Sequence, residues 1–462
     1  MSVQGKSRPN VVIFMLDTQR TDNLSCYGYG KPTSPNIERL AEEGCVFLDN
    51  ISPAIWTLPS TASMMTGLHV HSHGACAHND VYVDKPTTIA ETLDAQGYDT
   101  VAFYANKYCA ASRKGFREVH LNRGSGNHPG EGTFYVSRER VEEAIHWLER
   151  NYVGSKPRPF FLFIQVMDPH MPLHPVSPFR ERFLLPGATE DEVKAIKQGS
   201  PDIHAGRVQL TERQYAIMAS LYDAETAGAD SHVGLLADFM REKGILDETL
   251  FIVASDHGEM RGEHRNFGFH DHYAHHLCLY EELIKVPLVA RHPDWFAGGK
   301  RVEHSTQTLD IFPTLAEIIG FEAPQCQGFS LLSALTEAPK RSFTLTEYMK
   351  STHISLRTLD RFDPDFDPRI YLRWLKAWRK NGFKHIWTSD LRDELYDLRR
   401  DPKEKNNLIG RMPEKAKEMR VEMTNFLMTL PLAYYGDKAV TSRARPESID
   451  RLRALEFFHE II

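Results

Sequence analysis

A threonine at the expected start of a short helix is the first candidate for chemistry in this chain. The stretch reads Ala54-Ile55-Trp56-Thr57-Leu58-Pro59-Ser60-Thr61, and Gly67 follows it. Proline favours the first turn of a helix and glycine the residue after its end, so this pattern predicts a helix from Pro59 to about Thr66. Free amides and the helix dipole would then favour an anionic substrate and an ionised Thr57 hydroxyl. The alternative for this stretch alone is an ordinary capping threonine.

Polar residues that follow short apolar runs are the second group of candidates. Four such runs, 10–16, 100–104, 159–167 and 250–255, lead to Asp17, to Asn106-Lys107, to Asp168-Pro169-His170 and to Asp256-His257-Gly258-Glu259. Short apolar runs without alternation predict strands buried on both faces of a parallel sheet. Ligands bind beyond the carboxyl ends of such strands. We therefore expect Asp17, His170, Asp256 and His257 to form an active site at one rim.

The sequence also predicts helices that would cover this sheet. One is expected from Ser34-Pro35 to Gly44 and another from about Ser137 to Arg150. A longer helix is expected from a cap at Thr211 to about Lys243. Helices that alternate with strands predict an α/β architecture.

A series of phrases in fixed order carries a resemblance to a known family. They are Pro9-Asn10-Val11-Val12 leading to Asp17-Thr18-Gln19-Arg20, Ser34-Pro35-Asn36-Ile37-Glu38-Arg39-Leu40-Ala41, Thr57 through Gly67, Ser255-Asp256-His257-Gly258-Glu259, Leu279-Tyr280-Glu281-Glu282 with Val286-Pro287-Leu288, Asp310-Ile311-Phe312-Pro313-Thr314-Leu315, and Glu394-Leu395-Tyr396-Asp397-Leu398 with Asp401-Pro402 and Asn406-Asn407-Leu408. From residue 9 to about 410 the chain resembles the sulfatase branch of the alkaline phosphatase superfamily. The resemblance implies an alkaline-phosphatase-like α/β fold, with a mixed, mostly parallel sheet sandwiched by helices and a smaller C-terminal α+β subdomain.

The chain departs from this family at the nucleophile. Sulfatases carry Cys or Ser there, with Pro two positions and Arg four positions later, and they oxidise the Cys or Ser to formylglycine. Here Thr57 stands in that position and Thr61 replaces the Arg. A secondary alcohol oxidises to a ketone, so no formylglycine is expected. Relatives in the wider superfamily use an unmodified Thr or Ser against phosphorus, and by resemblance Thr57 belongs with them.

The residue types at the rim also favour one divalent metal ion. A threonine hydroxyl needs a base or a metal to ionise it. Asp17, Asp256 and His257 offer three ligands, and the Thr57 oxygen would be a further one. Oxygen ligands suit Mn, Mg or Ca, while the histidine leaves Zn or Mn open. The Thr18 hydroxyl or a water would complete the shell.

The resemblance assigns further catalytic and substrate-binding roles. His170 matches a histidine that contacts the substrate and protonates the leaving group, and His275 matches a Lys or His that faces the same oxygen. Asn79 and Lys107 match substrate-binding positions, and Thr61 is expected on the substrate side.

Five histidines gather between residues 263 and 276. They are His264, His270, His272, His275 and His276. A second metal site is one interpretation. The other, which we favour, is a loop over the active site whose histidines, His264 among them, bind anionic substrate and handle protons.

Composition favours a cytoplasmic hydrolase. The formal net charge of −7 gives no electrostatic case for nucleic acid. The six cysteines show no paired spacing and are expected as reduced thiols. No apolar run approaches the ~18 residues of a membrane helix, and the N-terminus does not resemble a signal peptide.

Three segments are expected along the 462 residues. A catalytic α/β domain would span 1–339. A small C-terminal unit, with strand-like stretches at 341–348 and 383–387 and a turn-rich stretch at 362–368, would span 340–435. A helical tail would occupy 436–462, and its apolar helix at 449–462 would dock either on its own domain or on a second copy in a homo-oligomer.

Several functions compete on the sequence alone. The main expectation is a metal-dependent hydrolase that uses Thr57 on a small anionic ester, a phosphodiester or phosphonate monoester, through a covalent phospho-enzyme. The alternatives are a sulfuric ester hydrolase, a transferase of the phosphoryl-linked group, and a non-catalytic binding descendant. The presence of Asp17, Asp256, His257 and His170 argues against the last of these.

Overall fold

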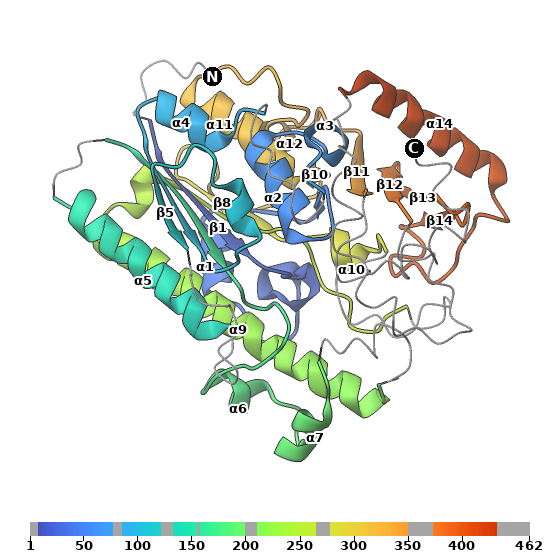
Figure 1. Ribbon diagram of the computed structural model, residues 1–462, viewed down its shortest axis with the longest axis horizontal. Coiled ribbons are helices and arrows are strands. Elements are labelled where there is room, and N and C mark those ends of the chain that lie inside the picture. The colour runs from blue at the N-terminus through green and yellow to red at the C-terminus, as the bar shows by residue number, and fades with distance from the viewer. Residues whose placement is uncertain are drawn as a thin grey trace, which may run out of the picture.

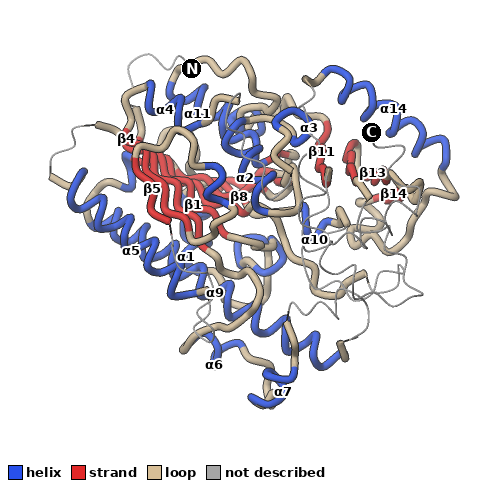
Figure 2. Tube along the Cα trace, in the orientation of Figure 1, coloured by secondary structure: helices blue, strands red, loops and turns tan. Residues whose placement is uncertain are grey.

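A central sheet lies between two layers of helices, and a smaller sheet lies beside them (Figures 1 and 2). The computed structural model describes residues 8–76, 86–121, 133–154, 158–198, 210–264, 278–349 and 373–431. Among the helices in these ranges, none combines the length and the apolar composition that a membrane-spanning helix requires.

The central sheet has eight strands in the order β5-β4-β6-β1-β7-β8-β2-β9. The first five in this order are mutually parallel: β5 (Glu118–Leu121), β4 (Asp99–Tyr104), β6 (Phe160–Val166), β1 (Asn10–Leu16) and β7 (Thr249–Ser255). Strand β8 (Leu288–Arg291) runs antiparallel to β7 and to β2 (Cys45–Phe47), and β9 (Lys300–Val302) runs parallel to β2. The four predicted strands therefore occur where expected, in a mixed and mostly parallel sheet.

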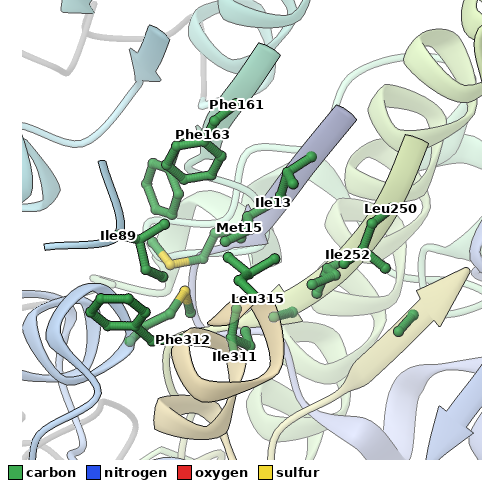
Figure 3. Packing of buried hydrophobic residues seen from close by; sticks show 14 of the residues in the cluster. Ile13, Met15, Ile89, Phe161, Phe163, Leu250, Ile252, Ile311, Phe312 and Leu315 are labelled. Carbon is green, nitrogen blue, oxygen red and sulfur yellow. The ribbon is translucent and has the colours of Figure 1, made fainter. Parts of the chain in front are cut away.

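The middle strand shows why its sequence has no polar alternation. Successive side chains of a strand point to opposite faces. Val11, Ile13 and Met15 of β1 belong to one hydrophobic cluster, seen in Figure 3, whereas Val12, Phe14 and Leu16 belong to the other. Both faces are fully buried, so both must be apolar.

One face of the sheet is covered by α1 (Pro35–Glu43), α5 (Phe134–Asn151) and α9 (Glu212–Glu242). These are the three helices that the sequence predicts as cover for the sheet. Thr211 caps α9 with a capping box, as expected. Asp230 of α9 accepts hydrogen bonds from the backbone amides of Asn36 (3.1 Å) and Ile37 (2.8 Å), so a side chain of one helix caps the start of α1.

The other face is covered by α2 (Thr57–Thr66), α4 (Ile89–Ala95), α11 (Ile311–Ile319) and α12 (Leu331–Ala334). Figure 3 shows Ile89 of α4 and Ile311, Phe312 and Leu315 of α11 against Met15 and Phe163 of the sheet. The other described helices before the C-terminal part are short: α3 (Val70–His73), α6 (Phe179–Phe183), α7 (Glu190–Ala195), α10 (Glu281–Ile284), and the 3-10 helices η1 (Thr21–Asn23), η2 (Ser25–Tyr27), η3 (Cys109–Ser112), η4 (Leu246–Glu248) and η5 (Thr308–Asp310).

A separate four-stranded antiparallel sheet follows in the C-terminal part. It consists of β11 (Phe343–Tyr348), β12 (Leu375–Lys380), β13 (Phe383–Thr388) and β14 (Glu394–Asp397), with α14 (Pro413–Thr429) packed on it (Figure 1). Strands β11 and β13 coincide with the two strand-like stretches of the sequence. Strand β12, which is rich in basic residues, and the two-stranded sheet of β3 (Asn50–Ile51) and β10 (Thr306–Gln307) are additions that the sequence does not predict.

Some expectations concern residues outside the described ranges. The turn-rich stretch 362–368 and the tail 436–462, with the oligomer contact assigned to it, are among them. The domain limits at 339/340 and 435/436 stay predictions.

Candidate active site

Three predicted metal ligands meet at the carboxyl ends of β1 and β7. These strands pair in register, with Leu16 opposite Ser255, so the residues that follow them, Asp17 and Asp256, are neighbours. His257 Nε2 lies 3.4 Å from Asp256 Oδ2 and 3.8 Å from Asp17 Oδ1. One ligand atom from each residue lies within 4.8 Å of the others, and this is the one group with metal-binding spacing found within the described ranges.

The environment of these side chains fits a divalent cation. All three are fully buried. Asp17 Oδ1 and Asp256 Oδ2 have no hydrogen-bond partner among the described residues. Burial, and next the negative charge of Asp256, raise the pKa of Asp17 well above its ordinary value. Two buried carboxylates with free oxygens are costly unless a positive charge compensates them, and a divalent cation would do so.

The other oxygens of the two carboxylates are held by the protein. Asp17 Oδ2 accepts hydrogen bonds from Asn106 Nδ2 (2.7 Å) and Gln165 Nε2 (3.2 Å). Asp256 Oδ1 accepts them from the backbone amides of Thr18 (3.2 Å) and His257 (2.8 Å). The ring Nδ1 of His257 lies 3.0 Å from the Gly258 carbonyl oxygen, which orients Nε2 towards the two aspartates. Such outer contacts orient metal ligands.

Thr18 has an unusual backbone beside this cluster. Its φ of 62° lies in the left-handed region, which a β-branched residue rarely adopts. The Tyr222 hydroxyl donates to the Thr18 carbonyl (2.6 Å) and accepts from the Arg20 amide (3.0 Å), which holds this conformation. The Thr18 hydroxyl is buried without a hydrogen-bond partner among the described residues. A role of this hydroxyl or of a water in the metal shell stays a prediction.

Thr57 is the first residue of α2, and its side chain is buried. Trp56 is the N-cap and no side chain caps this helix, so the alternative of an ordinary capping threonine is wrong. Asn106 Nδ2, which binds Asp17, lies 3.5 Å from Thr57 Oγ1. The hydroxyl of Ser60, one turn further along, donates to the Asp256 carbonyl oxygen (2.5 Å). Helix α2 is therefore fastened to the acidic cluster with Thr57 at its near end.

His170 follows β6 at the same rim. Its backbone amide donates to the Met167 carbonyl oxygen (2.7 Å), and its ring Nδ1 contacts the Met171 carbonyl oxygen. Burial lowers the pKa of His170 to about 4, with a smaller contribution in the same direction from His257.

The other predicted catalytic and substrate-binding residues lie in different environments. Lys107 is exposed, with its ammonium 5.2 Å from the ring centroid of Tyr108. Thr61 is buried, with its hydroxyl 3.9 Å from Met15 Sδ and 3.7 Å from Cys109 Sγ. His264 stacks on Tyr280 and lies 3.3 Å from Glu282 Oε2. His275 and Asn79 lie outside the described residues. The catalytic role of His275 and the four substrate-binding roles stay predictions.

Two residues that organise the site are not predicted from the sequence. Asn106 stands near a predicted strand end, but its residue type alone assigns it no role. Gln165 is the one polar residue in the apolar run of β6, and its Oε1 accepts from the Asn106 amide (2.6 Å) while its Nε2 donates to Asp17. An isolated amide side chain in a strand buried on both faces is the signal that could have identified it.

Comparisons with known proteins agree with this geometry. The family model described as Sulfatase matches residues 9–321. Arylsulfatase K of Xenopus laevis is 23% identical over 89% of this chain and 81% of its own length. A multifunctional alkaline phosphatase superfamily protein of Trinickia caryophylli is 22% identical over 87% of this chain and 92% of its own. The crystal structure of a phosphonate monoester hydrolase of Agrobacterium radiobacter superposes with a TM-score of 0.71 at 20% identity, covering 91% of this chain and 96% of that one. The chain belongs to the sulfatase family and is a hydrolase with the alkaline-phosphatase-like fold.

Proposed function

We propose that this hydrolase cleaves a phosphodiester or a phosphonate monoester, with unmodified Thr57 as the nucleophile. The observation that carries the proposal is the position of Thr57 at the N-terminus of α2, with Asn106 between its hydroxyl and Asp17. A hydroxyl that attacks an ester must lie beside the groups that ionise it.

The chemistry of the side chain supports an unmodified nucleophile. Threonine cannot form an aldehyde at this position, so its own oxygen would attack. The bond from Thr57 Oγ1 to phosphorus forms while the bond from phosphorus to the leaving alcohol breaks. Water then hydrolyses the phosphoryl ester and releases Thr57. Thr61, one turn along α2, contacts two sulfur atoms and carries no positive charge, unlike the arginine that sulfatases have at this position.

Two features would stabilise charge during attack. The first amides of a helix have no intrahelical partner, and the positive end of the α2 dipole favours an ionised Thr57. Asp17, Asp256 and His257 would hold a divalent cation together with Thr57, and when bound this cation would favour the ionised hydroxyl and neutralise charge on the ester.

His170 would act on the leaving group. In the substrate-free site it is neutral near pH 7, because burial lowers its pKa to about 4. An anionic ester beside the ring would raise this pKa, because opposite charge favours the protonated form. The ring would then donate its proton to the departing alkoxide. Loss of His170 should therefore slow esters with poor leaving groups by ~10²-fold or more, and activated esters much less.

The named relatives support two substrate classes. The likeness to phosphonate monoester hydrolases favours phosphorus esters, together with the departure at Thr57. The arylsulfatases among the curated relatives make sulfate esters the second candidate.

A matched panel of substrates separates these candidates. Purified protein would be assayed with 4-nitrophenyl esters of phosphate, methyl phosphate, phenylphosphonate and sulfate, each with Mn²⁺, Mg²⁺, Ca²⁺ or Zn²⁺. We expect turnover of the methyl phosphate or phenylphosphonate ester, with about one ion per chain. A wide preference for the sulfate ester would contradict the proposed substrate class. Full activity in metal-free protein would contradict the role of the cation.

Mass spectrometry tests the covalent step, in which Thr57 becomes bonded to phosphorus. Intact-mass analysis should find the native chain without oxidation at Thr57. Rapid quenching during turnover of the preferred phosphorus ester should trap an adduct that peptide mapping assigns to Thr57. An adduct on any other side chain would remove Thr57 from this role.

A further inference from the structure

A buried polar cluster lies behind the His170 segment and has no part in the chemistry above. Its members are Asp168, which follows β6, and Glu225 and His232, which are on α9. All three side chains are at most 1% exposed. Burying polar and charged groups costs free energy, so their presence in the interior requires a physical reason.

The cluster is joined through Asp168. Its Oδ1 accepts a hydrogen bond from Thr133 Oγ1 (2.8 Å), and its Oδ2 lies 3.6 Å from His232 Nε2. Burial raises the pKa of Asp168, but His232, together with hydrogen bonds from Ser137 and Glu225, outweighs this effect and brings the pKa below its ordinary value. Burial and the charge of Asp168 raise the pKa of Glu225. A neutral Glu225 beside an ionised Asp168 follows, because two adjacent buried carboxyls do not both ionise.

The cluster holds the His170 segment at both ends. Asp168 begins the segment, and the Glu225 carboxyl group accepts from the His174 backbone amide (2.7 Å) at its other end. Glu225 and His232 are about two helical turns apart and therefore lie on one face of α9. His170 lies between the two fastened points.

The position of His232 is itself fixed by packing. Its ring lies 4.5 Å from that of Phe134, at the start of α5, and α5 and α9 run side by side (Figure 1). A Cβ at Gly228 of α9 would stand 3.1 Å from the Phe134 ring, so glycine permits this approach. Phe134 thus packs against the imidazole that faces Asp168.

We propose that Asp168, His232 and Glu225 are positioning residues that hold His170 in register with the leaving group. This inference rests on the proposed role of His170 and extends it to α9. The three side chains act through the backbone of the segment and do not touch the reacting atoms. Their loss should therefore resemble a partial loss of His170, with selectivity for poor leaving groups.

The experiment compares two esters that share the same phosphoryl or sulfuryl group and differ only in the leaving group. The probes are the 4-nitrophenyl and phenyl esters of methyl phosphate, or of sulfate where the parent prefers sulfate. For His232→Leu and Asp168→Asn we expect the phenyl ester to lose ~10-fold or more in kcat/KM, and the nitrophenyl ester ~3-fold or less. His232→Gln, which keeps a hydrogen-bond donor, should recover part of the phenyl activity.

A double mutant separates positioning from general damage. If His232 acts through His170, then His170→Ala/His232→Leu should show the same ratio between the two esters as His170→Ala alone. A further change in the ratio would overturn the proposal. Asp230→Asn is the matched control, because Asp230 is a buried carboxylate of the same helix that caps α1 instead. It should lower stability without changing the ratio.

The measurements distinguish a failure of the acid role of His170 from a failure of the positioning role. If His170→Ala slows both esters equally, the acid role of His170 is wrong and the positioning role falls with it. If His170→Ala is selective while folded His232→Leu and Asp168→Asn slow both esters equally, only the positioning role is wrong. Circular dichroism and thermal unfolding of each variant establish that it is folded.

Discussion

Asn106 joins the two side chains on which the proposed chemistry depends. Its amide group donates to Asp17 (2.7 Å) and lies 3.5 Å from the Thr57 hydroxyl, and its backbone amide is held by Gln165. The hydrogen bond from Asn106 lowers the pKa of Asp17, against the larger effect of burial. Asn106 therefore helps to keep Asp17 ionised in a buried site.

Replacing Asn106 tests this role. In Asn106→Ala, Asp17 loses a donor and should bind a cation less tightly, because outer contacts of this kind contribute about 10- to 100-fold to metal affinity. We expect activity at limiting Mn²⁺ to fall by that factor and to recover partly at high Mn²⁺. Asn151→Ala, at the surface end of α5, is the control. Equal Mn²⁺ dependence in both variants would contradict the role of Asn106.

Thr57 permits a second test at the scale of one residue. Thr57→Ala should lose ~10³-fold or more of activity, because no nucleophile remains. Thr57→Ser should keep appreciable activity, since a primary hydroxyl can still reach the substrate. Thr66→Ala, at the other end of α2, removes a buried hydroxyl that bonds to the Ala62 carbonyl of the same helix and should stay active. Phosphodiester hydrolysis by Thr57→Ala at the parental rate would show that water attacks directly.

At the scale of elements, the ends of four adjacent strands assemble the site. Strands β4, β6, β1 and β7 are neighbours, and each delivers a polar residue just beyond its last residue or at its end. Their parallel direction places all four ends at one rim. Helix α2 then brings Thr57 to that rim from a different part of the chain.

Helix α3 contains a buried histidine that makes stability depend on pH. Burial lowers the pKa of His73 to about 4, from an ordinary value of 6.5. Ser63 Oγ lies 2.9 Å from Nε2, and the Ala75 amide donates to Nδ1 (3.0 Å), so the ring must be neutral when folded. Between these two pKa values the unfolded chain binds more protons, and stability therefore rises with pH. The contribution of His73 is complete above about pH 6.5 and is lost as the pH falls towards 4.

His73→Gln should reduce this dependence. The free energy of unfolding of the parent should fall more steeply between pH 6.5 and 4 than that of the variant, by about 1.4 kcal/mol per pH unit at most. Urea unfolding monitored across that range measures the difference. His146→Gln, at an exposed position of α5, should keep the parental slope. Parallel curves for the parent and His73→Gln would contradict the assignment.

At the scale of the whole molecule, a buried lysine connects the C-terminal sheet to the larger part of the chain. Lys384 of β13 is fully buried, and its ammonium donates to the Leu279 carbonyl oxygen (2.7 Å) and contacts Glu281 (3.1 Å) and Glu404 (2.5 Å). Burial lowers its pKa, but the two carboxylates outweigh burial and raise it overall. Leu279 and Glu281 lie at the start of α10, so this contact fastens the two parts together.

Lys384→Met should be strongly destabilising. It removes one charge and leaves Glu281 and Glu404 buried without it, a change that typically costs about 3–5 kcal/mol. Chemical unfolding should show this loss. Lys403→Met, at an exposed position next to Glu404, should cost little. A loss below about 1 kcal/mol in Lys384→Met would contradict an ion cluster that holds the two parts together.

The apolar runs and helix signals of the sequence by themselves determine much of the fold. A strand buried on both faces must be apolar throughout, so 10–16, 100–104, 159–167 and 250–255 are recognisable, and parallel pairing follows from their alternation with helices. The starts of α1 and α9 are marked by Ser34-Pro35 and Thr211, because capping is a local interaction. Asp17, Asp256, His257 and His170 follow as strand-end residues, and Thr57 as the start of a helix.

Only the tertiary structure decided which polar side chains meet across the chain. Asn106 and Gln165 are local features of β4 and β6, yet their contacts with Asp17 depend on the order of strands in the sheet. In the sequence His232 is one polar residue in a long helix, and only the packing of α9 behind β6 places it beside Asp168. Helix caps and buried strands are encoded over a few neighbouring residues, whereas these pairs join residues far apart in sequence. Their energies depend on distances and burial that no short stretch of sequence contains.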